Sequence, residues 1–108
     1  MNHERLNQPG VLACMLSGGE PHYFTDSPPM ALGPSMRQAL SFAELSTEPV
    51  LVKLGSYSVR VVRYGDDVLA VAYWNGSGIV KSLSRMMRRA MGLHRVRRVA
   101  TDAQAVVQ

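Results

Sequence analysis

Residues 50–91 constrain the fold more than any other stretch, because three β-type segments run there directly into one helical pattern. The β-type segments are 50–54, 57–64 and 68–74, joined by the turn-forming stretches Gly55-Ser56 and Tyr64-Gly65-Asp66-Asp67. A helix is expected over 78–91, with Ser77 as its N-cap and Gly92 as its stop. Its apolar residues have the spacing of one helical stripe: Ile79, Val80, Leu83, Met86, Met87, Ala90, Met91. The opposite side of this helix is basic. We therefore expect it to lay its apolar side on a sheet and to expose the basic side.

The N-terminal half predicts two further strands and one more helix. The strands are 11–17 and 20–25, and Gly18-Gly19 between them favours a two-residue hairpin turn. The helix is expected over 34–45, with Pro34 in its first turn, where a missing N–H costs least. Residues 1–10 are polar and are interrupted by proline and glycine, so at most one short helical turn can form there. The order of elements is β-β-α-β-β-β-α, an α+β fold.

The length of 108 residues allows one compact domain, divided into a short N-terminal segment (1–10), a domain (11–92) and a basic C-terminal tail (93–108). The longest apolar runs, 11–16 and 68–74, are far shorter than the roughly 20 residues that span a bilayer, and the first residues show no secretion-signal pattern. Cys14 is the only cysteine, so an internal disulfide is excluded. We expect a soluble, cytoplasmic protein.

Charge is distributed unevenly along the chain. Between positions 68 and 101 the chain has seven basic residues and no acidic residue: Lys81, Arg85, Arg88, Arg89, Arg95, Arg97, Arg98. The rest of the chain carries five basic and eight acidic residues. Such asymmetry indicates an acidic partner, which can be a protein surface, a nucleic acid or an anionic membrane surface.

The partner-binding candidates are the basic residues of the last expected helix: Lys81, Arg85, Arg88, Arg89. An acidic protein surface is the partner that we expect for them. Nucleic acid fits less well, because few aromatic side chains lie near the basic cluster to stack on bases. The alternative to any partner is an ordinary solvated helix face.

The cysteine and the histidines give no catalytic or metal-binding pattern. Cys14 lies within an apolar run and is expected to be a small core residue, since a reactive thiol needs an accessible, electropositive setting. The histidines at positions 3, 22 and 94 are far apart and have no metal-ligand spacing. We therefore expect no metal and no nucleophilic cysteine.

Two further motifs are better explained by turns than by chemistry. Asp66-Asp67 follows a glycine and suits a hairpin turn better than a carboxylate pair for acid–base catalysis. Gly76-Ser77-Gly78 precedes a helix, as in phosphate-binding loops. However, Val80 stands directly before Lys81, where such a loop needs glycine. The sequence therefore predicts a protein that is not an enzyme and has no cofactor.

Five segments within about residues 6–92 carry a resemblance to a known family: Pro9-Gly10-Val11, Val50-Leu51-Val52, Val59-Arg60-Val61-Val62, Val68-Leu69-Ala70-Val71-Ala72, Ile79-Val80-Lys81. In this order they resemble the Roadblock/dynein light-chain family, including its bacterial members that work with Ras-like GTPases. The resemblance implies a five-stranded antiparallel sheet with flanking helices, of profilin-like shape. It also implies a non-catalytic dimeric scaffold or regulator that associates with a small Ras-like GTPase.

The first helix of the resembled family is largely missing here. It usually packs beside the last helix, and residues 1–10 are too short to supply it in full. The resemblance therefore leaves that part of the sheet face to the tail from Leu93 onward or to another chain.

The resemblance also places residues 50–54 at the sheet edge, where an uncovered apolar strand tends to pair with its like. Small residues on the neighbouring helix would allow a second element to approach closely. The expected homodimer interface combines residues of this strand and of that helix: Val50, Val52, Leu54, Met36, Ala39, Ala43. Two other functions stay open, a small basic nucleic-acid-binding protein and a profilin-like small-molecule sensor.

Overall fold

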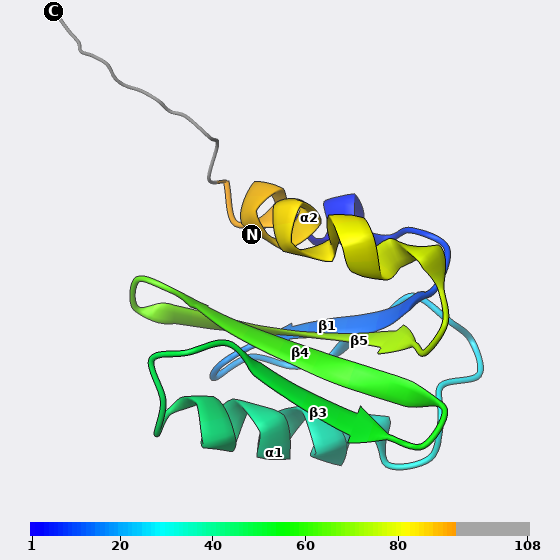
Figure 1. The fold of residues 1–108 in the computed structure, drawn as a ribbon, viewed down its shortest axis with the longest axis horizontal. Helices are drawn as coiled ribbons and strands as arrows, with labels where there is room; N and C mark the ends of the chain where they lie inside the picture. Colours follow the sequence, from blue (N-terminus) through cyan, green and yellow to red (C-terminus); the bar gives the residue numbers. More distant parts are fainter. Residues whose placement is uncertain (93–108) are drawn as a thin grey trace, which may run out of the picture.

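A five-stranded antiparallel sheet separates two helical layers (Figure 1). The structure, a computed structural model, describes residues 1–92, and the tail expected at 93–108 lies outside them. In chain order the elements are η1 (His3–Leu6), β1 (Val11–Leu16), β2 (His22–Tyr23), α1 (Leu32–Ala43), β3 (Val50–Leu54), β4 (Tyr57–Tyr64), β5 (Asp67–Trp74), η2 (Gly78–Ser82) and α2 (Leu83–Ala90), where η denotes a 3-10 helix. The strand order is β2-β1-β5-β4-β3. The predicted α+β fold is confirmed, and β3 lies at the sheet edge as expected.

The alternation of side chains along the strands decides which layer each residue contacts. In β4, Tyr57, Val59 and Val61 are buried on the face that α1 covers, as the period of two predicts. β5 is the central strand and pairs with β4 along its whole length. It is buried from Val68 to Tyr73, because helical layers cover both of its faces.

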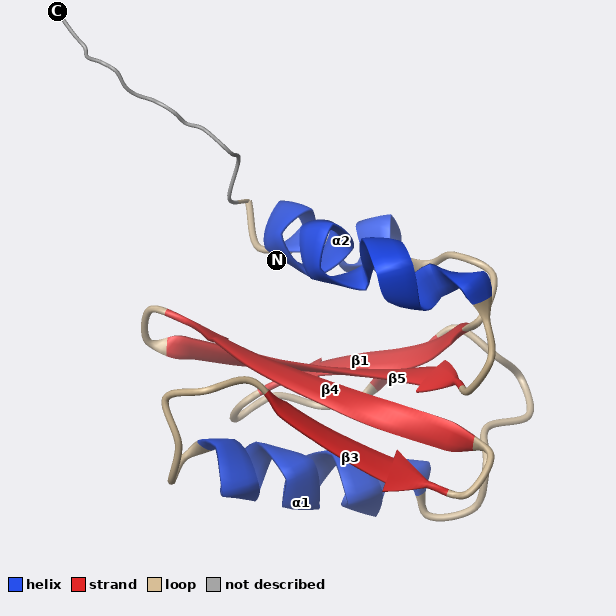
Figure 2. Ribbon diagram, in the orientation of Figure 1, coloured by secondary structure: helices blue, strands red, loops and turns tan. Residues whose placement is uncertain are grey.

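Helix α1 covers one face of the sheet (Figure 2). It spans Leu32–Ala43, two residues earlier at each end than the predicted 34–45. The earlier start follows from Ala31, whose left-handed conformation, with φ of 64°, turns the chain directly into the helix. Pro34 still falls in the first turn, where no backbone donor is needed. The sheet-facing side of α1 is buried: Leu32, Gly33, Met36, Ala39, Leu40, Ala43.

The opposite layer contains η2 and α2, where the sequence predicts one continuous helix over 78–91. Ser77 precedes this layer as expected, but its hydroxyl donates to the Trp74 carbonyl (2.8 Å) and does not cap the helix. The tighter 3-10 winding moves Val80 off the apolar stripe, so that 46% of its surface is exposed. The residues of α2 that contact the sheet are buried as predicted: Leu83, Met87, Ala90. Gly92, with φ of 79°, follows the helix end as predicted.

The N-terminal segment packs beside α2 in the same layer (Figure 2). Leu6 of η1 is fully buried in one cluster with Leu83, and the Asn2 amide donates to the Ala90 carbonyl at 2.8 Å. The segment forms a single 3-10 turn, as its composition predicts. This turn lies beside the last helix, where the resemblance expected the tail or another chain.

Within residues 1–92, no helix has the length and apolar character that a bilayer span requires.

The hairpin between β1 and β2 differs from the prediction. β2 contains only His22–Tyr23 and not residues 20–25, so the connection is longer than the two residues expected. Gly18 takes a left-handed φ of 80°, and Pro21 has no N–H with which to extend the ladder. The register pairs His22 with Cys14, which fixes where the side chains of β2 point.

Candidate functional site

Two of the predicted partner-binding residues line a groove between η1 and α2. Arg85 and Arg89 are exposed one turn apart on α2, and Arg5 faces them from η1. They line a hollow of about 320 Å³ together with three uncharged residues: Gln8, Ser82, Met86. A second hollow of about 280 Å³ adjoins it and shares Arg5 and Arg89. We call these two hollows the arginine groove.

Buried residues hold both walls of the arginine groove. Leu6 anchors η1, and Leu83 and Met87 anchor α2, all three fully buried on the same face of the sheet. The hydrogen bond from Asn2 to Ala90 ties the two walls together. Because core packing fixes both backbones, the arginines are presented together before any partner arrives, which reduces the ordering cost of binding.

The arginines of the groove have no ion-pair partner within residues 1–92. The ion pair found there joins Arg37 of α1 to Glu20 at 3.4 Å. Glu4, the acidic residue nearest in sequence, lines neither hollow. The helix dipole favours Arg89 in the last turn of α2, but it disfavours Arg85 in the first turn, and like charges four residues apart repel. The position of Arg85 therefore does not serve helix stability.

The other two predicted basic residues lie outside the groove. Arg88 is half-buried and, with Arg60 of β4, is close enough to Tyr64 to affect its ionisation. Burial raises the pKa of Tyr64, and the positive charges of Arg88 and Arg60 partly offset that rise. Lys81 is exposed on η2 and lines neither hollow. In its place the structure brings Arg5 to the site, a residue without a sequence signal because one short turn has no periodicity.

The residues proposed for a homodimer interface occupy two different environments. Met36, Ala39 and Ala43 are buried against the sheet of their own chain, which leaves them no exposed surface for a partner. The apolar stripe that these residues form along α1 is explained by its contact with the sheet of the same chain. Val50, Val52 and Leu54 of β3 are half-buried at the free sheet edge, packed against the same cluster. Only the strand part of the expected interface is therefore available to a second chain.

A further hollow, of about 450 Å³, lies beside β3 on the face that carries α2. Its lining is mixed in character: Leu51, Lys53, Ser58, Tyr73, Asn75, Gly76, Val80. The Asn75 side-chain amide donates to the Gly55 carbonyl at 2.6 Å, and the buried Ser58 hydroxyl donates to the Asn75 side-chain oxygen. These bonds join the turn between β3 and β4 to the end of β5, so the polar residues here have a structural role.

Cys14 is a core residue, as the sequence predicts. It is fully buried among the residues under α2, and burial raises the pKa of its thiol from 9.0 to about 11. The thiolate is the nucleophilic form of cysteine, and it is scarce at neutral pH with such a pKa.

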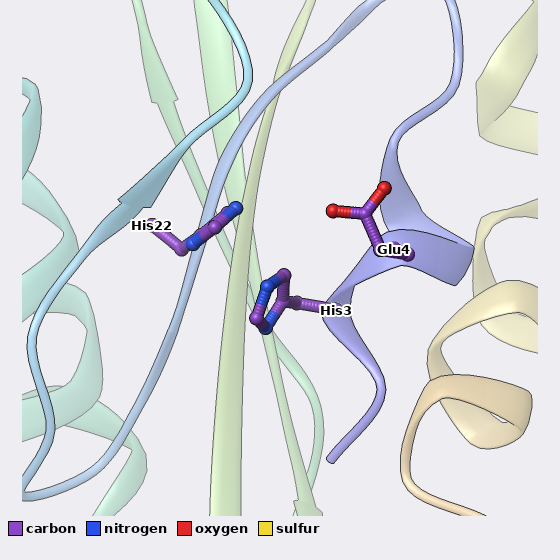
Figure 3. Close-up of side chains that lie close together, drawn as sticks. All are labelled: His3, Glu4 and His22. Carbon is purple, nitrogen blue, oxygen red and sulfur yellow. The ribbon is translucent and has the colours of Figure 1, made fainter.

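The fold brings together two histidines that the sequence keeps far apart. His3 on η1 and His22 on β2 have ring centroids 3.7 Å apart, and Glu4 lies beside them (Figure 3). Spacing along the sequence gives no sign of this contact, because it depends on where η1 folds back over the sheet. His94, the third histidine, lies outside the described residues.

Comparison of the sequence with protein-family models and with curated proteins gives no match.

Proposed function

We propose that this chain is a non-catalytic regulatory or scaffold module that docks an acidic protein surface in its arginine groove. The observation that carries the proposal is the convergence of Arg5, Arg85 and Arg89 from two elements, with no ion-pair partner in the described part of the chain. Guanidinium groups pair with carboxylates through two parallel hydrogen bonds, so three of them favour a cluster of acidic side chains. The resemblance to the Roadblock family suggests a small Ras-like GTPase as the partner.

A groove of this kind acts mainly on association. Exposed charges attract an oppositely charged partner over about 10 Å at 0.1 M salt, so binding should speed up as salt is lowered. The same charges contribute little to fold stability, because exposed ion pairs are worth about 0 to 1 kcal/mol. Partner capture and stability should therefore respond separately to mutation.

The module is proposed to be a homodimer formed through β3. This strand ends the sheet, so the polar backbone groups along its outer side lack a strand partner within the described fold. Leu51 on the same strand is 52% exposed. Pairing two β3 strands around a two-fold axis would join the sheets and bury Leu51, and it needs no contact from α1.

The test combines partner capture with a control of equal charge. The tagged chain is used to capture proteins from the source organism, and the binding rate of the recovered partner is then measured at several salt concentrations. The test variant is Arg85→Glu with Arg89→Glu. The control is Arg37→Glu with Lys81→Glu, which makes the same charge change at exposed positions outside the groove. We expect the test variant to slow capture at least tenfold at low salt and the control to slow it far less.

Two results would contradict the proposal. Equal slowing by both variants would mean that net charge matters and the groove does not. Retention of DNA or RNA by the wild-type chain, lost in the groove variant, would replace the protein partner with nucleic acid. Recovery of a partner that is not a GTPase would retain the docking site and remove the GTPase assignment.

A further inference from the structure

Three potential metal ligands meet where η1 crosses the sheet beside β2. His3 and Glu4 come from η1, and His22 comes from β2 (Figure 3). One ligand atom from each residue lies within 4.8 Å of the other two. Both histidines are half-buried and Glu4 is exposed, so the group is open to solvent and to an ion. We propose that His3, Glu4 and His22 form a binding site for a divalent transition-metal ion, with Zn²⁺ as the best fit.

The chemistry of the three side chains suits zinc better than a harder cation. Two imidazole nitrogens and one carboxylate oxygen are ligands that Zn²⁺ accepts in a tetrahedral shell, with bonds of about 2.0 to 2.2 Å. Ca²⁺ and Mg²⁺ prefer six or more oxygen ligands, which this group does not offer. Three protein ligands leave the fourth position of the shell to water or to a small anion.

The backbone already fixes the positions from which the ligands extend. His22 is held in β2 by its pairing with Cys14, and the Phe24 amide donates to the Leu12 carbonyl just beyond it at 2.8 Å. On the other side, Leu6 anchors η1 in the core. Metal binding therefore requires movement of side chains and not of strands.

The two imidazole rings must rotate and move apart to share one ion. They are tilted by 36°, and the lone pair of an imidazole nitrogen lies in the plane of its ring. Rotation about the Cβ–Cγ bond turns each ring nearly in place, so sharing an ion also requires rotation about the Cα–Cβ bond of His3 or His22, which moves the rings apart and directs a lone pair of each to one position. Phe24 contacts His22 edge-on at 5.0 Å and limits movement of that ring on its other side.

The polar atoms of these rings are not used elsewhere in the described structure. Within residues 1–92, neither imidazole takes part in a side-chain hydrogen bond or an ion pair. Arg5 follows Glu4 directly, but it lines the arginine groove. The site stands independently of the proposed docking function.

A bound ion would connect η1, which packs beside α2, to β2 at the edge of the sheet. An ion that binds only the folded chain raises the unfolding temperature as its concentration rises. Zinc should therefore stabilise the wild-type chain and have no such effect once a ligand is lost.

The first test follows the histidine side chains directly in the full chain. The sequence has only three histidines, so their ring signals can be resolved by NMR during titration with ZnCl₂ alone. We expect the His3 and His22 signals to change together and saturate at one ion per chain, with His94 unchanged. A change at His94 alone, or no change at His22, would overturn the site.

The second test measures zinc affinity by calorimetry in matched variants. His22→Ala and Glu4→Gln should each weaken binding at least tenfold, and His94→Ala should leave it unchanged. Circular dichroism in EDTA checks that each variant is folded, and the NMR titration of the wild type decides if one is not. Unchanged affinity in His22→Ala would show that zinc binds at His3 and its neighbouring backbone without β2. Absence of wild-type binding below about 100 μM would contradict the proposal outright.

Discussion

The two faces of the sheet are covered in different ways. On one face, the single helix α1 places a continuous apolar stripe on β3, β4 and β5. On the other face, the cover is assembled from three short elements, η1, η2 and α2, and it leaves more apolar side chains half-buried. The first face is closed by local periodicity, whereas the second needs segments from both ends of the described chain.

This difference explains where the candidate sites lie. Where two short elements meet, side chains from both of them line the junction. A single continuous helix offers no such junction. The arginine groove lies between η1 and α2, and the histidine pair lies between η1 and β2. We infer that the α1 face provides stability and that the α2 face provides binding.

The largest expected effect comes from truncating one leucine on each face. Leu32→Ala on α1 and Leu83→Ala on α2 each remove a buried side chain and should lower the free energy of unfolding by about 2 to 5 kcal/mol. Leu83→Ala should cost less, because the half-buried Met86 and Met91 on the same face can shift into the space. Denaturant melts measure both, with exposed Val80→Ala as a control that should change stability by less than about 0.5 kcal/mol. A larger loss at position 83 than at position 32 would contradict the inference that the α1 face provides stability.

The next effect is a loss of stability in alkali caused by Cys14 on the α2 face. Below pH 9 the Cys14 thiol is protonated in both the folded and the unfolded state. Between pH 9 and about 11 only the folded state retains this proton. The unfolded state then binds fewer protons, so stability falls as pH rises through this window, by up to about 3 kcal/mol. Comparing unfolding of the wild type and Cys14→Ala across pH 8 to 11 isolates this contribution from other groups. Parallel pH profiles for the two proteins would show that the thiol ionises normally in the folded chain.

A smaller effect is expected on dimerisation through β3, the edge strand of the sheet. Leu51→Lys places a charge at the exposed position of β3 that the proposed dimer buries, and we expect it to weaken the dimer at least tenfold, or about 1.4 kcal/mol. Light scattering over a range of concentrations measures the change. Tyr23→Lys, at an exposed position of β2 on the opposite edge of the sheet, is the matched control and should remain dimeric. A wild-type chain that stays monomeric at high concentration would remove the dimer from the proposal.

The smallest expected effect is on the free energy of unfolding, and it has opposite signs at Arg85 and Arg88 of α2. Arg85→Gln should raise the free energy of unfolding by about 0.2 to 0.5 kcal/mol, because it relieves repulsion from Arg89 one turn away. Arg88→Gln should lower it slightly, because Arg88 lies in the last turn, where the dipole favours a positive charge. Thermal melts at low salt detect both changes, and high salt should diminish them. A loss above about 1 kcal/mol for Arg85→Gln would indicate a structural role and weaken the case for the groove.

The sequence alone determined the local structure of most of this chain. The spans of β3 and β4 and the stop at Gly92 were predicted from turn residues and periodicity. These properties depend on neighbours within a few residues, which is the range over which such patterns carry information. The predictions failed by a few residues where a local exception intervened, as with the left-handed Ala31 before α1 and the short ladder of β2.

Only the tertiary structure decided which residues meet at the candidate sites. Arg5 joins Arg85 and Arg89 because the burial of Leu6 carries η1 to the side of α2, and the same fold-back places His3 on His22. Contacts between distant positions depend on how the whole chain buries its apolar surface. Polar residues on a single turn have no periodicity that could reveal this in advance. The sequence therefore determined the elements of the fold, and core packing decided the sites, because it alone fixes the distances between segments that are far apart in the chain.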